Sequence, residues 1–181
     1  MRILLFFASA LLLGEIYEIP KLSDSLSFIK SDSFVILDLD HTLVYIDGTP
    51  IENDLLYFFN QIKDRSERIA AFTGRPQHSS EFTRQKMAKL GIEFEPFELD
   101  NNNFNCENWW PCKHKAGIVY TGMGQKGPAL KMVLNATKYD AQHIVSIDNK
   151  LSNLESLQNT ADQIKIPFIG LLLNSNQLAS F

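Results

Sequence analysis

The sequence predicts a three-layer α/β fold in which helices cover both faces of a doubly wound, Rossmann-like, mostly parallel sheet. Two observations support this prediction. Short apolar runs rich in branched residues alternate with segments whose apolar residues recur at helical spacing, and polar residues follow directly after several of the apolar runs. Ligands of such sheets bind beyond the carboxyl ends of the strands, so these polar residues are the candidates for function.

The predicted elements alternate along the chain after a leader of uncertain structure. The strands are the apolar runs 33–37, 68–72, 92–94, 117–120, 143–147 and 166–173. The helices are the segments with apolar residues at helical spacing, 54–62, 79–90, 127–136 and 151–161. This alternation of strand and helix favours parallel pairing, because each parallel connection needs a crossover.

Length and composition indicate one domain. The chain has 181 residues, of which 45% are hydrophobic, and a net charge of -4. We expect a single domain over residues 32–181, preceded by a connecting region at 15–31, because the length leaves no room for two ordinary cores. The chain has no basic surplus, which makes nucleic acid an unexpected partner.

The first 14 residues form an apolar leader. A single positive charge at Arg2 precedes an uncharged run that ends at Gly14. The run is shorter than the roughly 20 residues that span a bilayer, so we predict a signal peptide or a short N-terminal anchor. An exported protein, periplasmic or secreted, is therefore expected, with membrane contact only through this segment. A buried first strand or helix in a cytoplasmic protein is the alternative.

Residues 95–115 interrupt the alternation and are expected to form an irregular insertion. The stretch contains both cysteines, Cys106 and Cys112. In an exported protein such a pair would close a small disulfide loop, and two free thiols are the alternative. Only His114 lies near them, whereas a structural zinc site usually has four ligands. A zinc site is therefore not expected here.

Two carboxylates, Asp38 and Asp40, follow the apolar run 33–37 and are separated by one residue. The period-two geometry of an extended chain turns both toward the same side. Like charges this close are costly unless a cation neutralises them, so the pair predicts a metal site or an acid/base couple. A solvated aspartate-rich turn with a capping role is the alternative that this pair leaves open.

Other polar residues occupy similar positions. Thr73 and Gly74 follow the run 68–72, where the hydroxyl would either hold a phosphate oxygen or cap the loop. Lys126 precedes the predicted helix 127–136, where its ammonium and the helix amides favour an anion. A lysine that is only solvated is the plain alternative.

Asp148 ends another apolar run and is followed by Asn149. The order Asp-x-Asp-x-Thr, Thr-Gly, Lys-Gly and Asp-Asn resembles the four-motif signature of haloacid dehalogenase-like (HAD-like) hydrolases. The resemblance covers nearly the whole chain after the leader, and its details are similar to an exported bacterial HAD-like family of unknown function. It implies a sheet of the HAD-like type with a small cap or insertions, and a phosphohydrolase domain over residues 32–181.

The resemblance also implies a magnesium-dependent phosphatase that works through an aspartyl-phosphate. Asp38 would attack phosphorus, and Asp40 would protonate the leaving oxygen and later deprotonate water. Thr73, Gly74 and Lys126 would bind the phosphoryl group. The predicted catalytic residues are therefore the two aspartates together with the threonine and the lysine.

The predicted metal ligands are the carboxylates of Asp38 and Asp148 and the main-chain carbonyl of Asp40, a set of hard oxygen ligands that suits Mg²⁺. Asn149 stands where many relatives carry a second acidic residue, which predicts weaker metal binding or low activity. His41 occupies a position that is often Gly. It would either tune the acid/base residue or have no role.

Substrate choice is expected to depend on the short segments 44–52 and 95–115, the parts of the chain available as a cap. A small cap leaves the site open to a phosphorylated small molecule or to a phosphorylated protein side chain. The alternative function is a catalytically weak or inactive module that binds a partner through Trp109 and Trp110.

Overall fold

The computed structural model describes residues 14–66, 68–97, 103–106, 110–137 and 139–174. The strands are β1 (Glu15–Ile19), β2 (Ser33–Leu37), β3 (Arg68–Thr73), β4 (Asn103–Cys106), β5 (Trp110–Lys115), β6 (Ile118–Tyr120), β7 (His143–Asp148) and β8 (Phe168–Leu173). The α-helices are α1 (Leu55–Lys63), α2 (Ser80–Lys89), α3 (Lys126–Thr137) and α4 (Leu151–Ile164), and the 3₁₀ helices are η1 (Leu22–Phe28) and η2 (Gln77–Ser79).

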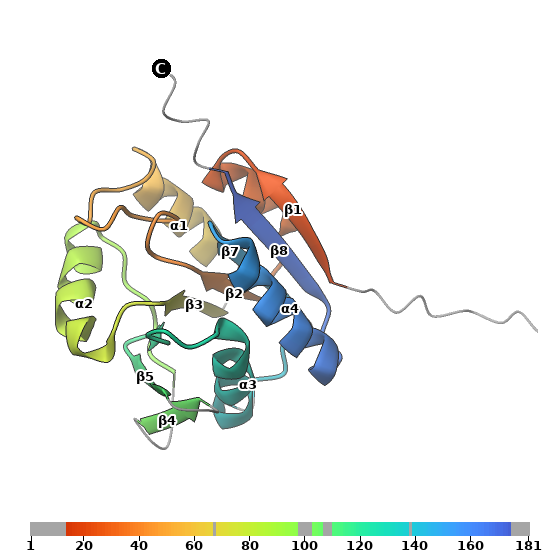
Figure 1. The fold of residues 1–181 in the computed structure, drawn as a ribbon. Coiled ribbons are helices and arrows are strands. Elements are labelled where there is room, and N and C mark those ends of the chain that lie inside the picture. Colours follow the sequence, from red (N-terminus) through yellow and green to blue (C-terminus); the bar gives the residue numbers. More distant parts are fainter. Residues whose placement is uncertain (1–13, 67, 98–102, 107–109, 138, 175–181) are drawn as a thin grey trace, which may run out of the picture.

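The strands of the described residues belong to one eight-stranded sheet with the order β1-β8-β7-β2-β3-β6-β5-β4 (Figure 1). The pairs from β1 to β6 are parallel, and β5 and β4 add an antiparallel edge. The predicted α/β class with a mostly parallel sheet is therefore confirmed, and its arrangement is compatible with a Rossmann-like fold.

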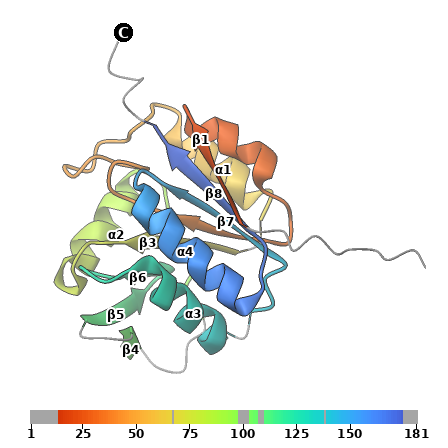
Figure 2. The same cartoon turned by 45° about the vertical axis from the view of Figure 1, so that its right-hand side comes forward.

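The sheet carries a hydrophobic cluster on each face, which makes the three layers. Alternate side chains of β2 enter opposite clusters: Val35 and Leu37 pack with α1 and η1, whereas Phe34 and Ile36 pack with α3 and α4. Figure 2 shows α3 and α4 on one side of the sheet and α1 with η1 on the other. A central strand that is buried on both faces has to be apolar throughout, which explains the continuous apolar run of β2.

Helix α1 illustrates how local pattern and burial agree. Its buried residues Leu55, Phe58, Phe59 and Ile62 recur at helical spacing and face the sheet. The predicted helices 54–62, 79–90, 127–136 and 151–161 correspond to α1 to α4, with ends that differ by at most three residues. The alternation that the sequence predicts is thus confirmed for the body of the domain.

Two expectations need correction. The stretch 95–115, expected to be irregular, contains the antiparallel pair β4 and β5, which extends the sheet at one edge. Residues 92–94, predicted as a strand, form no regular element. Their alternation comes instead from Ile92 and Phe94 packing into the cluster on the α1 face. The connecting region 15–31, for which the sequence predicts no particular structure, contains β1 and η1.

Several predictions concern residues that the structure does not describe. Residues 1–13 of the leader lie outside the described residues, as do Trp109 and the side chain of Trp110. In the described part of the chain, no helix combines the length and the apolar character needed to cross a bilayer. Cys112 is disulfide-bonded, and Cys106 is the other cysteine of the sequence. The structure thus favours the disulfide over free thiols.

Candidate active site

Strands β2 and β7 bring two of the predicted carboxylates together. The strands pair in parallel with Leu37 opposite Ile147, so Asp38 and Asp148 leave the sheet side by side. The Asp38 main-chain N–H donates to the Ile147 carbonyl at 2.9 Å, which continues the ladder by one residue. Both aspartates continue the set of side chains that faces α3 and α4, because strand side chains alternate with period two.

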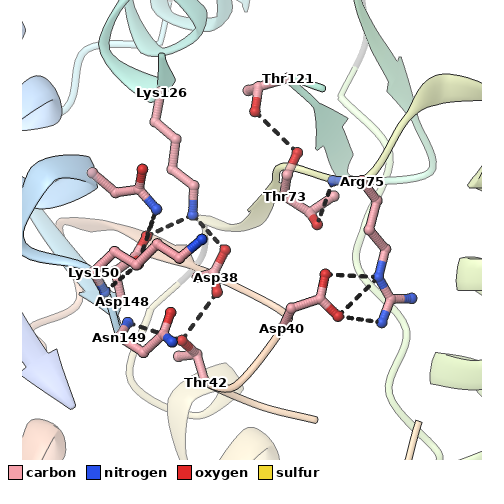
Figure 3. A network of polar contacts seen from close by, with 11 residues as sticks. Asp38, Asp40, Thr42, Thr73, Arg75, Thr121, Lys126, Asp148, Asn149 and Lys150 are labelled. Carbon is pink, nitrogen blue, oxygen red and sulfur yellow. Dashed lines mark hydrogen bonds and ion pairs between the residues drawn. The ribbon is translucent and has the colours of Figure 1, made fainter. Parts of the chain in front are cut away.

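Lys126, at the start of α3, lies between these two carboxylates. Its ammonium donates to Asp38 Oδ1 at 2.5 Å and to Asp148 Oδ2 at 2.6 Å (Figure 3). The three side chains are 3%, 7% and 1% exposed for the lysine, Asp38 and Asp148. We call these three residues the sealed cluster. Lys126, for which solvation was the alternative, is therefore buried and paired with two carboxylates.

Neutral donors complete the sealed cluster. The Thr42 hydroxyl donates to Asp38 Oδ2 at 3.1 Å. Asp148 accepts from the Asn153 amide at both oxygens, at 3.0 Å each, and from the Lys150 main-chain N–H at 2.8 Å. With Lys126 included, Asp148 accepts four hydrogen bonds, whereas Asp38 accepts two. Asp38 thus keeps more capacity for a further partner.

The sealed cluster has one more negative than positive group, and burial makes that imbalance costly. Burial raises the pKa of Asp38 to about 6, although the charge of Lys126 opposes this shift; the nearby Asp148 carboxylate adds to it. For Lys126, burial alone would lower the pKa, but the two carboxylates outweigh it and the net direction is upward. The cluster therefore favours the approach of another positive group.

Asp40 forms a separate ion pair with Arg75, which we call the open pair. The Arg75 Nε lies 3.1 and 3.0 Å from the two Asp40 oxygens, and Nη2 lies 2.6 Å from Oδ1. Arg75 also donates to the Thr83 hydroxyl of α2 at 3.2 Å. The Asp40 side chain is 28% exposed and that of Arg75 is 11% exposed. The second predicted aspartate is therefore held at the surface of the site by a forked contact.

One cavity of about 660 Å³ joins the sealed cluster to the open pair. Its wall includes four of the predicted site residues, Asp38, Asp40, Gly74 and Lys126. Arg75 and residues of the β6–α3 loop and of the start of α4 also line it. Because the cavity lies at the carboxyl ends of β2, β3, β6 and β7, its position agrees with the rule for parallel α/β sheets.

Thr73 and Asp148 do not contribute to the wall of this cavity. Thr73 is fully buried, and its hydroxyl accepts a hydrogen bond from the Arg75 main-chain N–H at 3.2 Å. Its carbonyl accepts one from the Thr121 hydroxyl at 3.0 Å. In the structure Thr73 therefore shapes the loop that presents Arg75. A direct contact between Thr73 and phosphate stays a prediction.

Sequence reasoning missed several residues of this site as functional candidates. Thr42 ends the Asp-x-Asp-x-Thr motif and Arg75 directly follows Thr-Gly, but neither has a predicted role. Asn153 and Lys150, which follow Asp148 in the sequence, are not among the predicted site residues. A usable signal was present for Arg75, because an arginine two residues after a strand end faces the loop that carries the two aspartates.

The donor set can be tested against the Mg²⁺ that the motifs imply. Within the described ranges, no group of three or more His, Cys, Asp or Glu side chains is suited to hold a metal ion. Mg²⁺ does not require such a group, since it is usually bound by one or two carboxylates and keeps several waters. Asn149 Oδ1, beside the cavity, is shielded from solvent and has no hydrogen-bond partner among the described residues. Two carboxylates and an unpaired amide oxygen fit a hard cation.

The fold and the site define an α/β protein with acidic and basic side chains gathered at the carboxyl edge of its sheet. A family described as "Protein of unknown function (DUF2608)" matches residues 45–177, and the chain belongs to this family. This corrects the expected membership of the HAD-like superfamily, because the family that matches has no known function and no HAD-like family matches. No solved structure matches the chain.

Two curated proteins are similar to this chain at low identity. A "Putative outer membrane protein" of Chlamydia trachomatis serovar D is 21% identical over 127 residues, which cover 70% of this chain and 47% of that protein. A "Putative outer membrane protein" of Chlamydia pneumoniae is 21% identical over 129 residues, with coverages of 71% and 48%. The chain thus spans about half the length of these relatives.

Proposed function

We propose that this protein is a magnesium-dependent phosphatase that hydrolyses phosphomonoesters through an aspartyl-phosphate on Asp38. The observation that carries the proposal is the placement of the Asp38 carboxylate on the wall of a cavity that Lys126 and the open pair also line. A nucleophile, a cation to balance charge and a second carboxylate for proton transfer are the groups that phosphoryl transfer through a covalent intermediate needs.

In the first half of the proposed reaction, an Asp38 oxygen bonds to phosphorus as the ester P–O bond breaks. Asp40, in its protonated form, gives a proton to the leaving oxygen. In the second half, Asp40 takes a proton from water as the water oxygen attacks the aspartyl-phosphate, which releases inorganic phosphate and restores Asp38. Lys126 balances the negative charge of the nucleophile throughout, and Arg75 orients Asp40 toward the cavity.

The residues that would hold Mg²⁺ are Asp38, Asp148 and the main-chain carbonyl of Asp40, with Asn149 Oδ1 as a further oxygen. When bound, the cation would offset the repulsion between an anionic substrate and an anionic nucleophile. The proposed weak point is Asn149, a neutral residue beside Asp148 that gives the site less negative charge than an acid would.

The proposed substrates are phosphorylated small molecules or phosphorylated protein side chains. Ile46 and Met123 line the cavity and are 69% and 84% exposed, so the mouth is wide and partly apolar. An open mouth admits a phosphate that is carried on a larger group, and an apolar rim favours leaving groups with apolar surface.

Export is also part of the proposal. Disulfides persist mainly in oxidising compartments, and Cys112 is disulfide-bonded. The names of the chlamydial relatives point the same way. Fractionation of cells that express the full chain should recover it from a periplasmic or secreted fraction. Recovery from the cytoplasm alone would contradict export and favour the cytoplasmic alternative.

The test of the enzyme proposal is hydrolysis of p-nitrophenyl phosphate by the full chain with and without Mg²⁺. We expect turnover that a chelator abolishes, that Asp38→Asn removes, and that the matched surface variant Asp162→Asn leaves unchanged. Hydroxylamine displaces phosphate from an acyl phosphate and leaves a hydroxamate on the carboxyl group. Brief incubation with substrate followed by hydroxylamine should therefore produce a hydroxamate in the wild type and none in Asp38→Asn. Turnover that persists in Asp38→Asn would exclude the proposed intermediate.

The predicted alternative, a binding module that uses Trp109 and Trp110, depends on side chains outside the described residues. No contact in the described part of the chain favours it. If folded, metal-loaded protein shows no activity toward a broad set of phosphomonoesters, the result would favour the binding module.

A further inference from the structure

The cavity has two cations whose charge is already balanced. Lys126 is shared by Asp38 and Asp148, and Arg75 is held by Asp40 through three close contacts. An entering phosphate group brings up to two further negative charges. Asp38 and Asp40, which hold these two cations, line the cavity themselves, so neither cation can receive the phosphate without weakening a contact that it already makes. Mg²⁺ would offset part of the added negative charge, but neither Lys126 nor Arg75 has a positive charge left for the phosphoryl oxygens.

Lys150 is a third cation beside this cavity. It follows β7 directly, lines the cavity, and its side chain forms no ion pair within the described residues. Figure 3 shows the side chain extending from the end of β7 toward Asp38 and Lys126. Its ammonium is thus available to an anion that enters from the mouth.

The backbone of Lys150 is fixed although its side chain is exposed. Its main-chain N–H donates to Asp148 Oδ1 at 2.8 Å, and its φ and ψ of -120° and 119° place it in extended conformation just before α4. The side chain therefore starts from a point set by the sealed cluster itself. A flexible lysine stem on a fixed base can follow a phosphoryl group as it moves from ester to aspartyl-phosphate.

We propose that Lys150 is a substrate-binding residue that contacts the phosphoryl group of the phosphomonoester. The inference rests on the proposed function and extends it. It identifies a residue outside the four motifs, Lys150, as the group that neutralises the negative charge of the phosphoryl oxygens. Lys126 and Arg75 are already paired with carboxylates, so Lys150 supplies the positive charge for the phosphoryl group. Its contact is to the phosphoryl oxygens common to all substrates, rather than to a second acidic group on the leaving group.

The test compares Lys150→Gln with Lys131→Gln, a matched change of an exposed lysine on α3 outside the cavity. Binding of inorganic phosphate in the presence of Mg²⁺, measured by calorimetry, should weaken roughly tenfold in Lys150→Gln, since a charge-assisted contact is lost. Lys131→Gln should bind as the wild type does. Lys150→Arg should recover most of the affinity, because the positive charge returns.

Kinetics add a second readout. With p-nitrophenyl phosphate and with phosphoglycolate, which carries a carboxylate on its leaving group, Lys150→Gln should raise KM by a similar factor of roughly ten and change kcat little. Unchanged phosphate affinity, or no phosphate binding by the wild type, would overturn the proposal. A defect confined to phosphoglycolate would also overturn it, because Lys150 would then contact the leaving group.

The two proposals fail in different ways. Failure of the phosphatase proposal appears as absent turnover, or as turnover that Asp38→Asn does not affect. Failure of the Lys150 proposal appears as unchanged phosphate binding in Lys150→Gln, a measurement that needs no turnover. Thermal unfolding of each variant confirms that affinity is compared between folded proteins.

Discussion

The sealed cluster and the open pair face the same cavity, but they hold their charges in different ways. In the sealed cluster, Lys126 satisfies Asp38 and Asp148 at 2.5 and 2.6 Å with almost no access to solvent. In the open pair, Arg75 forms an ion pair with Asp40, whose side chain is 28% exposed. Both are ion pairs of similar length. Their surroundings differ, and surroundings determine what an ion pair contributes.

This difference suggests different roles for the sealed cluster and the open pair. Charges sealed from water cannot be released without a large cost, so the cluster keeps Asp38 in a fixed place and in a charged environment. An exposed pair can open at small cost because water replaces the lost partner. A group that is proposed to gain and lose a proton in each reaction cycle suits the second setting, and a nucleophile that has to stay in place suits the first.

The largest effect should come from removing the shared cation. Lys126→Met leaves two buried carboxylates without a counter-charge and should lower the free energy of unfolding by about 3–5 kcal/mol. Urea denaturation at neutral pH measures it, with Lys131→Met on the same helix as the exposed control. A loss below about 1 kcal/mol would mean that the cluster is hydrated in solution, and the contrast with the open pair would disappear.

The two carboxylates of the sealed cluster should not be equivalent. Asp148 accepts four hydrogen bonds, so Asp148→Asn should cost about 2 kcal/mol. Asp38→Asn should change stability by less than about 1 kcal/mol, because Lys126 keeps Asp148 and the excess negative charge is removed. Both variants are compared by urea denaturation. Equal losses would contradict the assignment of Asp148 as the structural anchor of the cluster.

A smaller effect is expected for the open pair. Arg75→Leu should lower the free energy of unfolding by about 1 kcal/mol, and the loss should shrink at high sodium chloride concentration. The loss in Lys126→Met should depend little on salt. Denaturation at low and high salt distinguishes the two. A large, salt-independent loss in Arg75→Leu would show that the open pair is as sealed as the cluster.

The smallest effect concerns the residue that follows Asp40. His41 has a φ of 61°, a left-handed conformation that costs side chains with a Cβ more than it costs glycine. His41→Gly should therefore stabilise the protein by about 0.5 kcal/mol, whereas His41→Ala should not. Thermal unfolding of the two variants measures the difference. Destabilisation by glycine would indicate that the imidazole contributes to packing, for example through its edge contact with Tyr45.

Local pattern explains which parts of the fold were predictable. Helix α1 and strand β2 bury side chains at regular spacing, so their periods appear in the sequence. The strands β4 and β5 do not have this property. Their segment is rich in asparagine and contains a proline, and they exist as strands because β6 offers a free edge to pair with. A strand that is added at a sheet edge does not need the regular apolar spacing that predicts α1 and β2 from the sequence.

The sequence by itself determined the alternation of elements and the positions of Asp38, Asp40 and Asp148 after strand ends, because burial and strand period are local properties. Only the tertiary structure decided which cation meets which carboxylate. Lys126 lies 88 residues from Asp38, and Arg75 lies 35 residues from Asp40. Contacts over such separations depend on the order of the strands and on which face each helix covers. No local spacing encodes either of these.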